Sequence, residues 1–158
     1  MRKVAISMDE LVPLLMMQLE TSGSAILNVT GYSMLPMLHS RKDAVRLAPV
    51  DQLQGKGELI LYRRDNGLYV LHRILREKKD GYVCCGDNQF ITERIRRDQV
   101  LAVVRGFTRN GKTYSVENKT YQLYVWCWVN FHPLRLVYLI PRRCIGWVRA
   151  KLRRLKRR

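Results

Sequence analysis

Cysteines are few in this sequence, and their arrangement excludes two common uses. Only four occur among 158 residues, and two of them, Cys84 and Cys85, are adjacent. Adjacent cysteines form neither the CxxC knuckle of a zinc site nor a familiar disulfide framework. We therefore expect a reducing compartment, and the sequence gives no reason to expect a metal or another cofactor.

A long uninterrupted hydrophobic run is also missing. Near the N-terminus only a short apolar stretch separates Lys3 from the acids Asp9 and Glu10, which does not make a secretory signal. The apolar segment 121–140 carries several polar residues and Arg135, and a central Arg costs about 2.5–3.5 kcal/mol on insertion scales. We expect an interfacial helix or helical hairpin there, in a chain that starts on the cytoplasmic side.

Acidic residues are scarce as well. The chain has 13 Asp and Glu against 29 Lys and Arg, a net charge of +16, and residues 142–158 include no acid. This imbalance predicts an anionic partner, either an acidic bilayer or nucleic acid. Because aromatic residues precede the basic stretch, we expect a membrane-associated tail that binds an anionic membrane surface from the cytoplasmic side. Nucleic acid binding and a transmembrane hairpin are the less favoured alternatives.

The remaining sequence predicts a helix followed by strands. Ser7 and Glu10 have the spacing of a capping box, and leucines recur at helical intervals over residues 8–21. Asn66-Gly67, Asp80-Gly81 and Asn110-Gly111 are strong hairpin turn signals. Short runs rich in Val, Ile, Leu and Tyr read as strands at 25–30, 44–47, 58–63, 68–76, 82–85 and 100–108.

These patterns predict a mainly β fold. We expect a compact antiparallel β domain over residues 23–118, preceded by an N-terminal helix over 1–22. A C-terminal basic amphipathic helical segment, residues 119–158, should form a separate aromatic and basic tail.

The segment from Gly31 to Leu38 contains a candidate nucleophile. Its pattern is Gly-x-Ser-Met-x-Pro-x-Leu, with Ser33 between two bulky residues just after a predicted strand. A serine between Gly and Pro is by itself most often a turn residue. The whole string, however, resembles the nucleophile box of the type I signal peptidase clan, which also contains the self-cleaving repressor peptidases.

A serine nucleophile needs a base, and His72 is the candidate. The period of two in its strand places His72 on one face with Val70 and Ile74, so it should point inward, where it could equally be a buried core histidine. Val70-Leu71-His72-Arg73 resembles the Val-x-His-Arg form of the Ser/His branch of the clan. That branch includes the endoplasmic reticulum, archaeal and spore-former signal peptidases, and its typical spacing is similar to the 39 residues between Ser33 and His72.

Two acids are candidates for the residue that orients the histidine. Asp87 lies in Gly86-Asp87-Asn88, which resembles the box that follows the base strand in this family. In the Ser/His relatives the assigned acid lies about six or seven residues later, where the nearest match is Glu93. We place Asp87 first and Glu93 second; Asp87 could instead brace its own turn, and Glu93 could be a solvated surface residue.

The resemblance implies a function. The backbone amide of Ser33 would contribute to the oxyanion hole, and Gly31 stands where some relatives have an additional Ser. The implied activity is that of a serine endopeptidase whose substrate is a peptide or protein with a leader or signal segment. The alternative is a non-catalytic basic β module that binds anionic membrane or nucleic acid. A self-cleaving regulator is disfavoured, because a helix-turn-helix segment is missing and His replaces Lys.

Overall fold

The first helix is defined by caps at both ends. The computed structural model describes residues 7–131, and its helix α1 spans Met8–Ser22. The Ser7 backbone N–H donates to the Glu10 carboxylate at 3.2 Å, while the Glu10 N–H donates to the Ser7 hydroxyl at 3.3 Å. Gly23 ends the helix at φ 68°, a left-handed conformation that glycine adopts without strain. The predicted capping box and N-terminal helix are confirmed.

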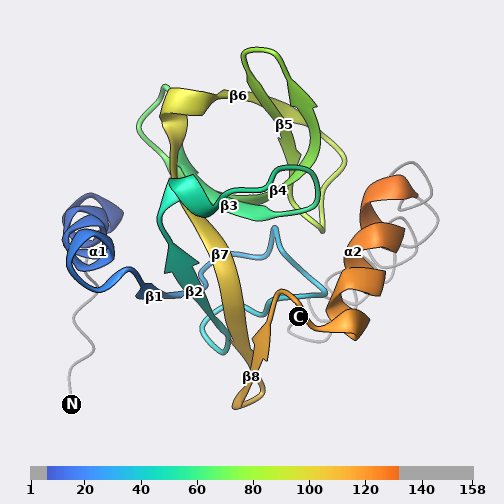
Figure 1. Cartoon of the computed structure of the whole chain (residues 1–158), viewed down its shortest axis with the longest axis horizontal. Helices are drawn as coiled ribbons and strands as arrows, with labels where there is room; N and C mark the ends of the chain where they lie inside the picture. The colour runs from blue at the N-terminus through green and yellow to red at the C-terminus, as the bar shows by residue number, and fades with distance from the viewer. Residues whose placement is uncertain (1–6, 132–158) are drawn as a thin grey trace, which may run out of the picture.

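The centre of the molecule is one curled antiparallel sheet (Figure 1), and the prediction of a mainly β fold is confirmed. Its strand order is β1-β2-β7-β3-β4-β5-β6, with β8 paired to β7 outside this path. The short 3₁₀ turns η1 (Val50–Gln52) and η2 (Arg97–Gln99) precede β3 and β7. The strands are β1 (Ala25–Asn28), β2 (Ala44–Ala48), β3 (Leu59–Arg63), β4 (Tyr69–Lys78), β5 (Gly81–Cys85), β6 (Glu93–Arg96), β7 (Val100–Arg109) and β8 (Lys112–Ser115).

Strands β6 and β8 do not appear among the predicted strands. The sequence of β6, Glu-Arg-Ile-Arg, is mostly charged, and only Ile95 is buried. Pairing with β5, which is buried along its whole length, makes this segment a strand. Strand β8 follows Asn110-Gly111, where both φ angles are positive, as a tight hairpin requires.

Three apolar clusters pack on the sheet. In the largest, Leu15 and Leu19 of α1 pack with residues of β1, β2 and β7, which holds the helix against that end of the sheet. In the second, Ile60, Tyr62 and Ile74 pack together, and Figure 1 shows that β3 to β6 curl into a ring. The third holds Leu75, Cys85 and Val129. His72 lies on the strand that borders the second cluster, so its environment is largely dry.

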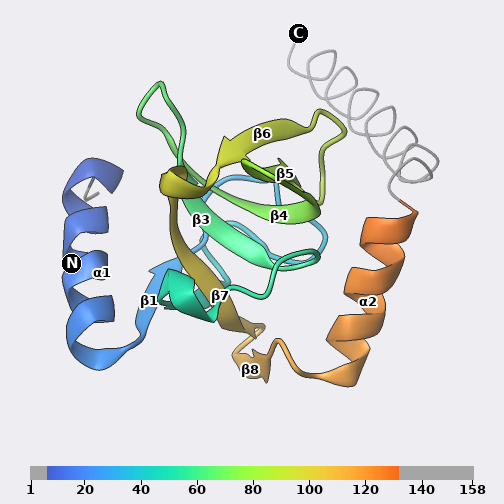
Figure 2. The same cartoon turned by 45° about the horizontal axis from the view of Figure 1, so that its top comes forward.

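Helix α2 spans Lys119–Asn130 and lies at the end of the sheet opposite α1 (Figure 2). The Asn118 side chain caps it by accepting hydrogen bonds from the Thr120 and Tyr121 amides at 3.0 and 3.2 Å. The predicted tail thus begins as a helix. The basic stretch 142–158 lies outside the described residues, and the boundary between residues 118 and 119 stays a prediction.

Candidate functional site

Ser33 lies in a closed loop between β1 and β2. The base of the loop is fastened by the Val29 N–H, which donates to the Asp43 carbonyl at 2.9 Å, and by the Arg41 N–H, which donates to the Val29 carbonyl at 2.7 Å. Gly31 has φ 83° with open space around it, so the backbone conformation, and not crowding, favours glycine there. The loop presents Ser33 half-buried, two residues beyond this glycine.

The imidazole of His72 is held from one side by a carboxylate. His72 is only 2% exposed on β4, and its Nδ1 lies 2.9 Å from Glu93 Oε1 and 3.0 Å from the Tyr62 hydroxyl. An ionised carboxylate only accepts hydrogen bonds. The proton of the neutral imidazole is therefore on Nδ1, which donates a hydrogen bond to Glu93. The neutral ring therefore keeps its lone pair on Nε2, which is the atom a general base needs.

The other side of the imidazole faces the loop of Ser33. A side-chain carbon added at Gly86 would lie 3.0 Å from His72 Nε2 and 2.7 Å from the carbonyl oxygen of Ser33. The same carbonyl accepts the Asn88 N–H at 2.7 Å. Gly86 therefore lies between the base and the nucleophile loop, and any larger residue would push the two apart.

Burial sets the charge state of the histidine. It lowers the pKa of His72, although the nearby Glu93 carboxylate acts in the opposite direction. Burial alone would raise the pKa of Glu93, but hydrogen bonds from Arg64 and Tyr62 lower it overall. The pair is thus a neutral imidazole beside an ionised carboxylate at neutral pH.

Two further residues, Tyr62 and Arg64, complete this network and were missed by the sequence reasoning. The Tyr62 hydroxyl donates a hydrogen bond to Glu93 Oε1. The Arg64 guanidinium donates one hydrogen bond to each carboxylate oxygen of Glu93, at 2.6 and 2.8 Å. In the hairpin Ile60 pairs with His72, and Tyr62 lies two residues along the same strand face as Ile60. A two-residue turn at Asn66-Gly67 would pair Leu61 with His72 instead, so the turn signal alone does not place Tyr62 beside the histidine.

Asp87 lies away from the imidazole, so Glu93 and not Asp87 contacts His72; which of the two acids serves a reaction stays a prediction. The two carboxylate oxygens of Asp87 accept hydrogen bonds from Arg73 at 2.9 and 2.7 Å, and both side chains are fully buried. His72 and Arg73 are consecutive on β4, so their side chains leave opposite faces of the strand. Asp87 lies on the Arg73 face, whereas Glu93 lies on the His72 face.

The predicted donor of the oxyanion hole is the backbone amide of Ser33. Ser33 belongs to a series of turns, and its carbonyl is fixed by Asn88. The role of the Ser33 amide in an oxyanion hole stays a prediction.

Cys84 is unsuited to act as a rival nucleophile. It is fully buried in β5, and burial raises the pKa of its thiol to about 12. A thiol in that state is protonated at neutral pH and reacts slowly.

A cavity of about 250 Å³ opens beside the candidate residues. Its wall is mixed. The polar residues that line it are Asn28, Thr30, Ser33, Arg64, Tyr69, His72 and Gln89, and the apolar ones are Met8, Leu27, Val29, Met34, Leu61, Val70 and Leu71. Met8 brings the first turn of α1 into its wall.

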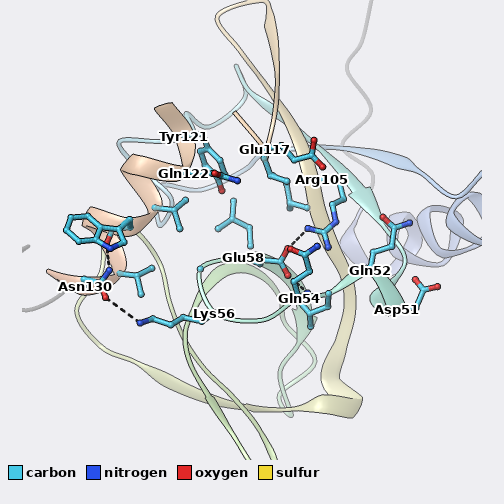
Figure 3. A pocket seen from close by; sticks show the side chains of 18 residues that line it. Asp51, Gln52, Gln54, Lys56, Glu58, Arg105, Glu117, Tyr121, Gln122 and Asn130 are labelled. Carbon is cyan, nitrogen blue, oxygen red and sulfur yellow. Dashed lines mark hydrogen bonds and ion pairs between the residues drawn. The ribbon is translucent and has the colours of Figure 1, made fainter. Parts of the chain in front are cut away.

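A larger cavity, about 790 Å³, lies between α2 and the segment that leads into β3 (Figure 3). None of the four candidate residues lines it, so its size does not make it the site of the proposed chemistry. An ion pair between Glu58 and Arg105 stands in its wall, and Lys56 reaches Asn130 across its rim at 3.4 Å.

Within residues 7–131, no group of three or more His, Cys, Asp and Glu side chains could hold a metal ion. In the same range neither helix is long and apolar enough to cross a bilayer. The chain matches no family model, no curated protein and no solved structure.

Proposed function

We propose that this chain is a serine endopeptidase of signal-peptidase-like type that cleaves a peptide bond in a leader or signal peptide. One observation carries the proposal: His72 Nδ1 lies 2.9 Å from Glu93 Oε1, and its Nε2 is on the side of the loop that bears Ser33. The resemblance of the Ser33 and His72 segments to the Ser/His signal peptidases supports the same reading.

The proposed reaction divides into two proton-balanced steps. His72 Nε2 takes the proton of the Ser33 hydroxyl while Oγ bonds to the scissile carbonyl carbon. The C–N bond then breaks, and Nε2 returns the proton to the leaving amine. A water molecule next gives one proton to Nε2 while its oxygen attacks the acyl ester, and the Ser33 hydroxyl is restored as the carboxylic acid leaves. Glu93 stays ionised and stabilises the imidazolium in both steps.

The substrate would bind extended beside Ser33. The cavity of about 250 Å³, whose wall is part polar and part apolar, is large enough for one small side chain and too small for several bulky ones. Small residues at the cut site are also what the resemblance implies. The substrate class is therefore a peptide or protein with a leader or signal segment that places such residues in extended conformation.

We also propose that the tail attaches the enzyme peripherally to an anionic membrane surface. Helix α2 supports this proposal, because Leu123 is 62% and Trp126 is 56% exposed on the helix, and Phe131 is exposed just after it. Large apolar side chains on an exposed helical face favour the headgroup boundary, and the charge of +16 favours an anionic leaflet. The membrane side proposed is the cytoplasmic one.

Labelling with a fluorophosphonate probe tests the catalytic proposal. The wild-type protein should become covalently labelled at Ser33, and Ser33→Ala should abolish labelling and lower peptide cleavage on the order of 10⁴ to 10⁶ fold. Ser24→Ala, a serine outside the loop, is the matched control and should react like the wild type. A wild-type chain that fails to react, or Ser33→Ala labelled as fast as wild type, would favour the non-catalytic basic module.

Liposome co-sedimentation of the full chain tests the membrane proposal. Binding to anionic vesicles should exceed binding to neutral ones and weaken with salt, because screening shortens the reach of the basic residues to roughly 8 Å at physiological ionic strength. The double variant Leu123→Ser with Trp126→Ser should lose the salt-resistant part. Equal binding by that variant at high salt would contradict attachment through α2.

A further inference from the structure

Helix α2 reaches the neighbourhood of Ser33 through a buried polar cluster, which we call the Asp87 joint; it comprises Arg73, Asp87, Tyr121, Tyr124 and Trp128. The Tyr124 hydroxyl donates to Asp87 Oδ2 at 2.9 Å. The Trp128 indole N–H donates to the backbone carbonyl of Asp87 at 3.1 Å. Arg73 donates to the Tyr121 hydroxyl at 3.1 Å. Three side chains of one helix therefore converge on a single loop residue and its ion-pair partner.

The ion pair at the centre of the joint is buried and is contacted by the aromatic side chains of α2. Neither Arg73 nor Asp87 has an exposed side chain, and the guanidinium lies 5.8 and 5.7 Å from the ring centres of Tyr121 and Tyr124. Tyr124 and Trp128 stack with ring centres 5.1 Å apart. A buried charge pair is stable only when hydrogen bonds satisfy its other lone pairs, and α2 supplies some of those bonds. The position of Asp87 therefore depends on α2.

The residues on either side of Asp87 touch the catalytic candidates. Asn88 donates its backbone N–H to the Ser33 carbonyl at 2.7 Å and its side-chain amide to the Tyr32 carbonyl at 3.1 Å. Gly86, on the other side, packs between Ser33 and His72 Nε2. A shift of Asp87 would move both neighbours, and with them the separation between nucleophile and base.

We propose that Tyr124 and Trp128 are positioning residues for the peptidase reaction. Helix α2 holds residues 86–88 at the place where they set Ser33 against His72, so the start of the tail belongs to the catalytic unit. This inference rests on the proposed peptidase function. Misplacement of reacting groups by a fraction of an ångström lowers turnover without changing how strongly substrate binds elsewhere.

The first test compares three substitutions on α2 in the full chain. Tyr124→Phe and Trp128→Phe keep an aromatic ring but remove the hydroxyl or the indole N–H. Gln122→Ala is the control, because Gln122 is exposed on the same helix and is not a member of the joint. We expect kcat per titrated active site to fall about tenfold in the first two variants, with KM within about twofold of wild type. The control should keep both constants.

A merely structural role would give a different result. Active-site titration would then find fewer competent molecules, or Tm would fall, while kcat per active site stayed at the wild-type value. That result, or an equal loss of kcat in Gln122→Ala, would overturn the positioning role.

Hydrogen exchange supplies a readout that does not depend on activity. The Asn88 amide, which bonds to the Ser33 carbonyl, should exchange about tenfold faster in Tyr124→Phe and Trp128→Phe than in wild type or Gln122→Ala. Unchanged exchange would overturn the coupling of α2 to the loop even if the protein is a peptidase. Faster exchange in a chain that no serine-directed probe labels would instead retain the coupling and reject the peptidase function.

Discussion

The two faces of β4 carry two pairs of ionisable side chains that differ in charge, exposure and partners. On one face, His72 meets Glu93, whose side chain is 24% exposed and is also held by Arg64 and Tyr62. On the other face, Arg73 meets Asp87, and neither side chain reaches solvent. The residues that start the two pairs are neighbours in sequence, yet the strand geometry sends them into separate environments.

The His72–Glu93 pair can change its charge by gaining or losing a proton, and the Arg73–Asp87 pair cannot. Burial lowers the pKa of His72, so the imidazole is neutral at neutral pH and can accept a proton there. Burial would also lower the pKa of Arg73, but the attraction of Asp87 raises it well above its usual value. The His72 face is thus suited to proton transfer, and the Arg73 face to holding loops and helices in place.

The largest effect should come from the acid on the His72 face. Glu93→Gln keeps the size of the side chain but removes the charge that stabilises the imidazolium, and its amide can turn a donor toward Nδ1 and disfavour the productive tautomer. We expect kcat to fall on the order of 10³ to 10⁴ fold with little change in fold, as measured by peptide cleavage and circular dichroism. Should Glu93→Gln keep half of the wild-type rate, Glu93 is not the orienting acid.

Removing the acid on the Arg73 face should chiefly affect stability. Asp87→Asn leaves Arg73 as a buried charge without its counter-ion, which costs about 3–5 kcal/mol in free energy of unfolding. Urea unfolding followed by tryptophan fluorescence measures this. Asp98→Asn, which removes an exposed partner of Arg96, is the control and should leave the midpoint almost unchanged. Equal urea midpoints for the two variants would contradict the claim that the Arg73 face of β4 stabilises the fold.

A smaller loss of kcat should follow when Glu93 is kept but loses its hydrogen bonds from Arg64. Arg64→Ala removes the two hydrogen bonds to Glu93 and a positive charge that lowers the pKa of His72. We expect kcat to fall roughly tenfold and the acidic limb of the pH-rate profile to move to higher pH. Arg63→Ala is the control, since Arg63 is exposed and lies over Tyr69. If the acidic limb moves to lower pH instead, the charge of Arg64 does not lower the pKa of His72, and the proposed role of Arg64 is wrong.

The smallest effect concerns the wild-type profile itself. Because burial holds the pKa of His72 below its ordinary value near 6.5, kcat/KM should rise with pH through a midpoint below about 6.5 and then level off. The base is active when neutral, so activity is lost as pH falls through this midpoint. Cleavage rates from pH 4.5 to 9 measure it. A residual activity of His72→Ala that kept the same acidic limb would assign the limb to another group.

Much of the fold could be predicted from local patterns. The capping box at Ser7 and Glu10, the hairpin at Asn110-Gly111 and six of the eight strands follow from residue order alone, because their signals lie within a few neighbouring residues. Strand β6 could not be predicted this way. Its charged sequence becomes a strand only because β5 offers it a partner, and that partner is set by the whole sheet.

The sequence by itself determined which residues were candidates, since Ser33, His72, Asp87 and Glu93 all stand in recognisable segments. Only the tertiary structure placed Glu93 beside His72 and Asp87 beside Arg73, and revealed the contacts of Tyr62, Arg64 and α2. The reason is that choosing a partner for His72 requires the strand register and the face of each side chain. A shift of register by one residue would exchange the faces of His72 and Arg73, and no local pattern carries that information.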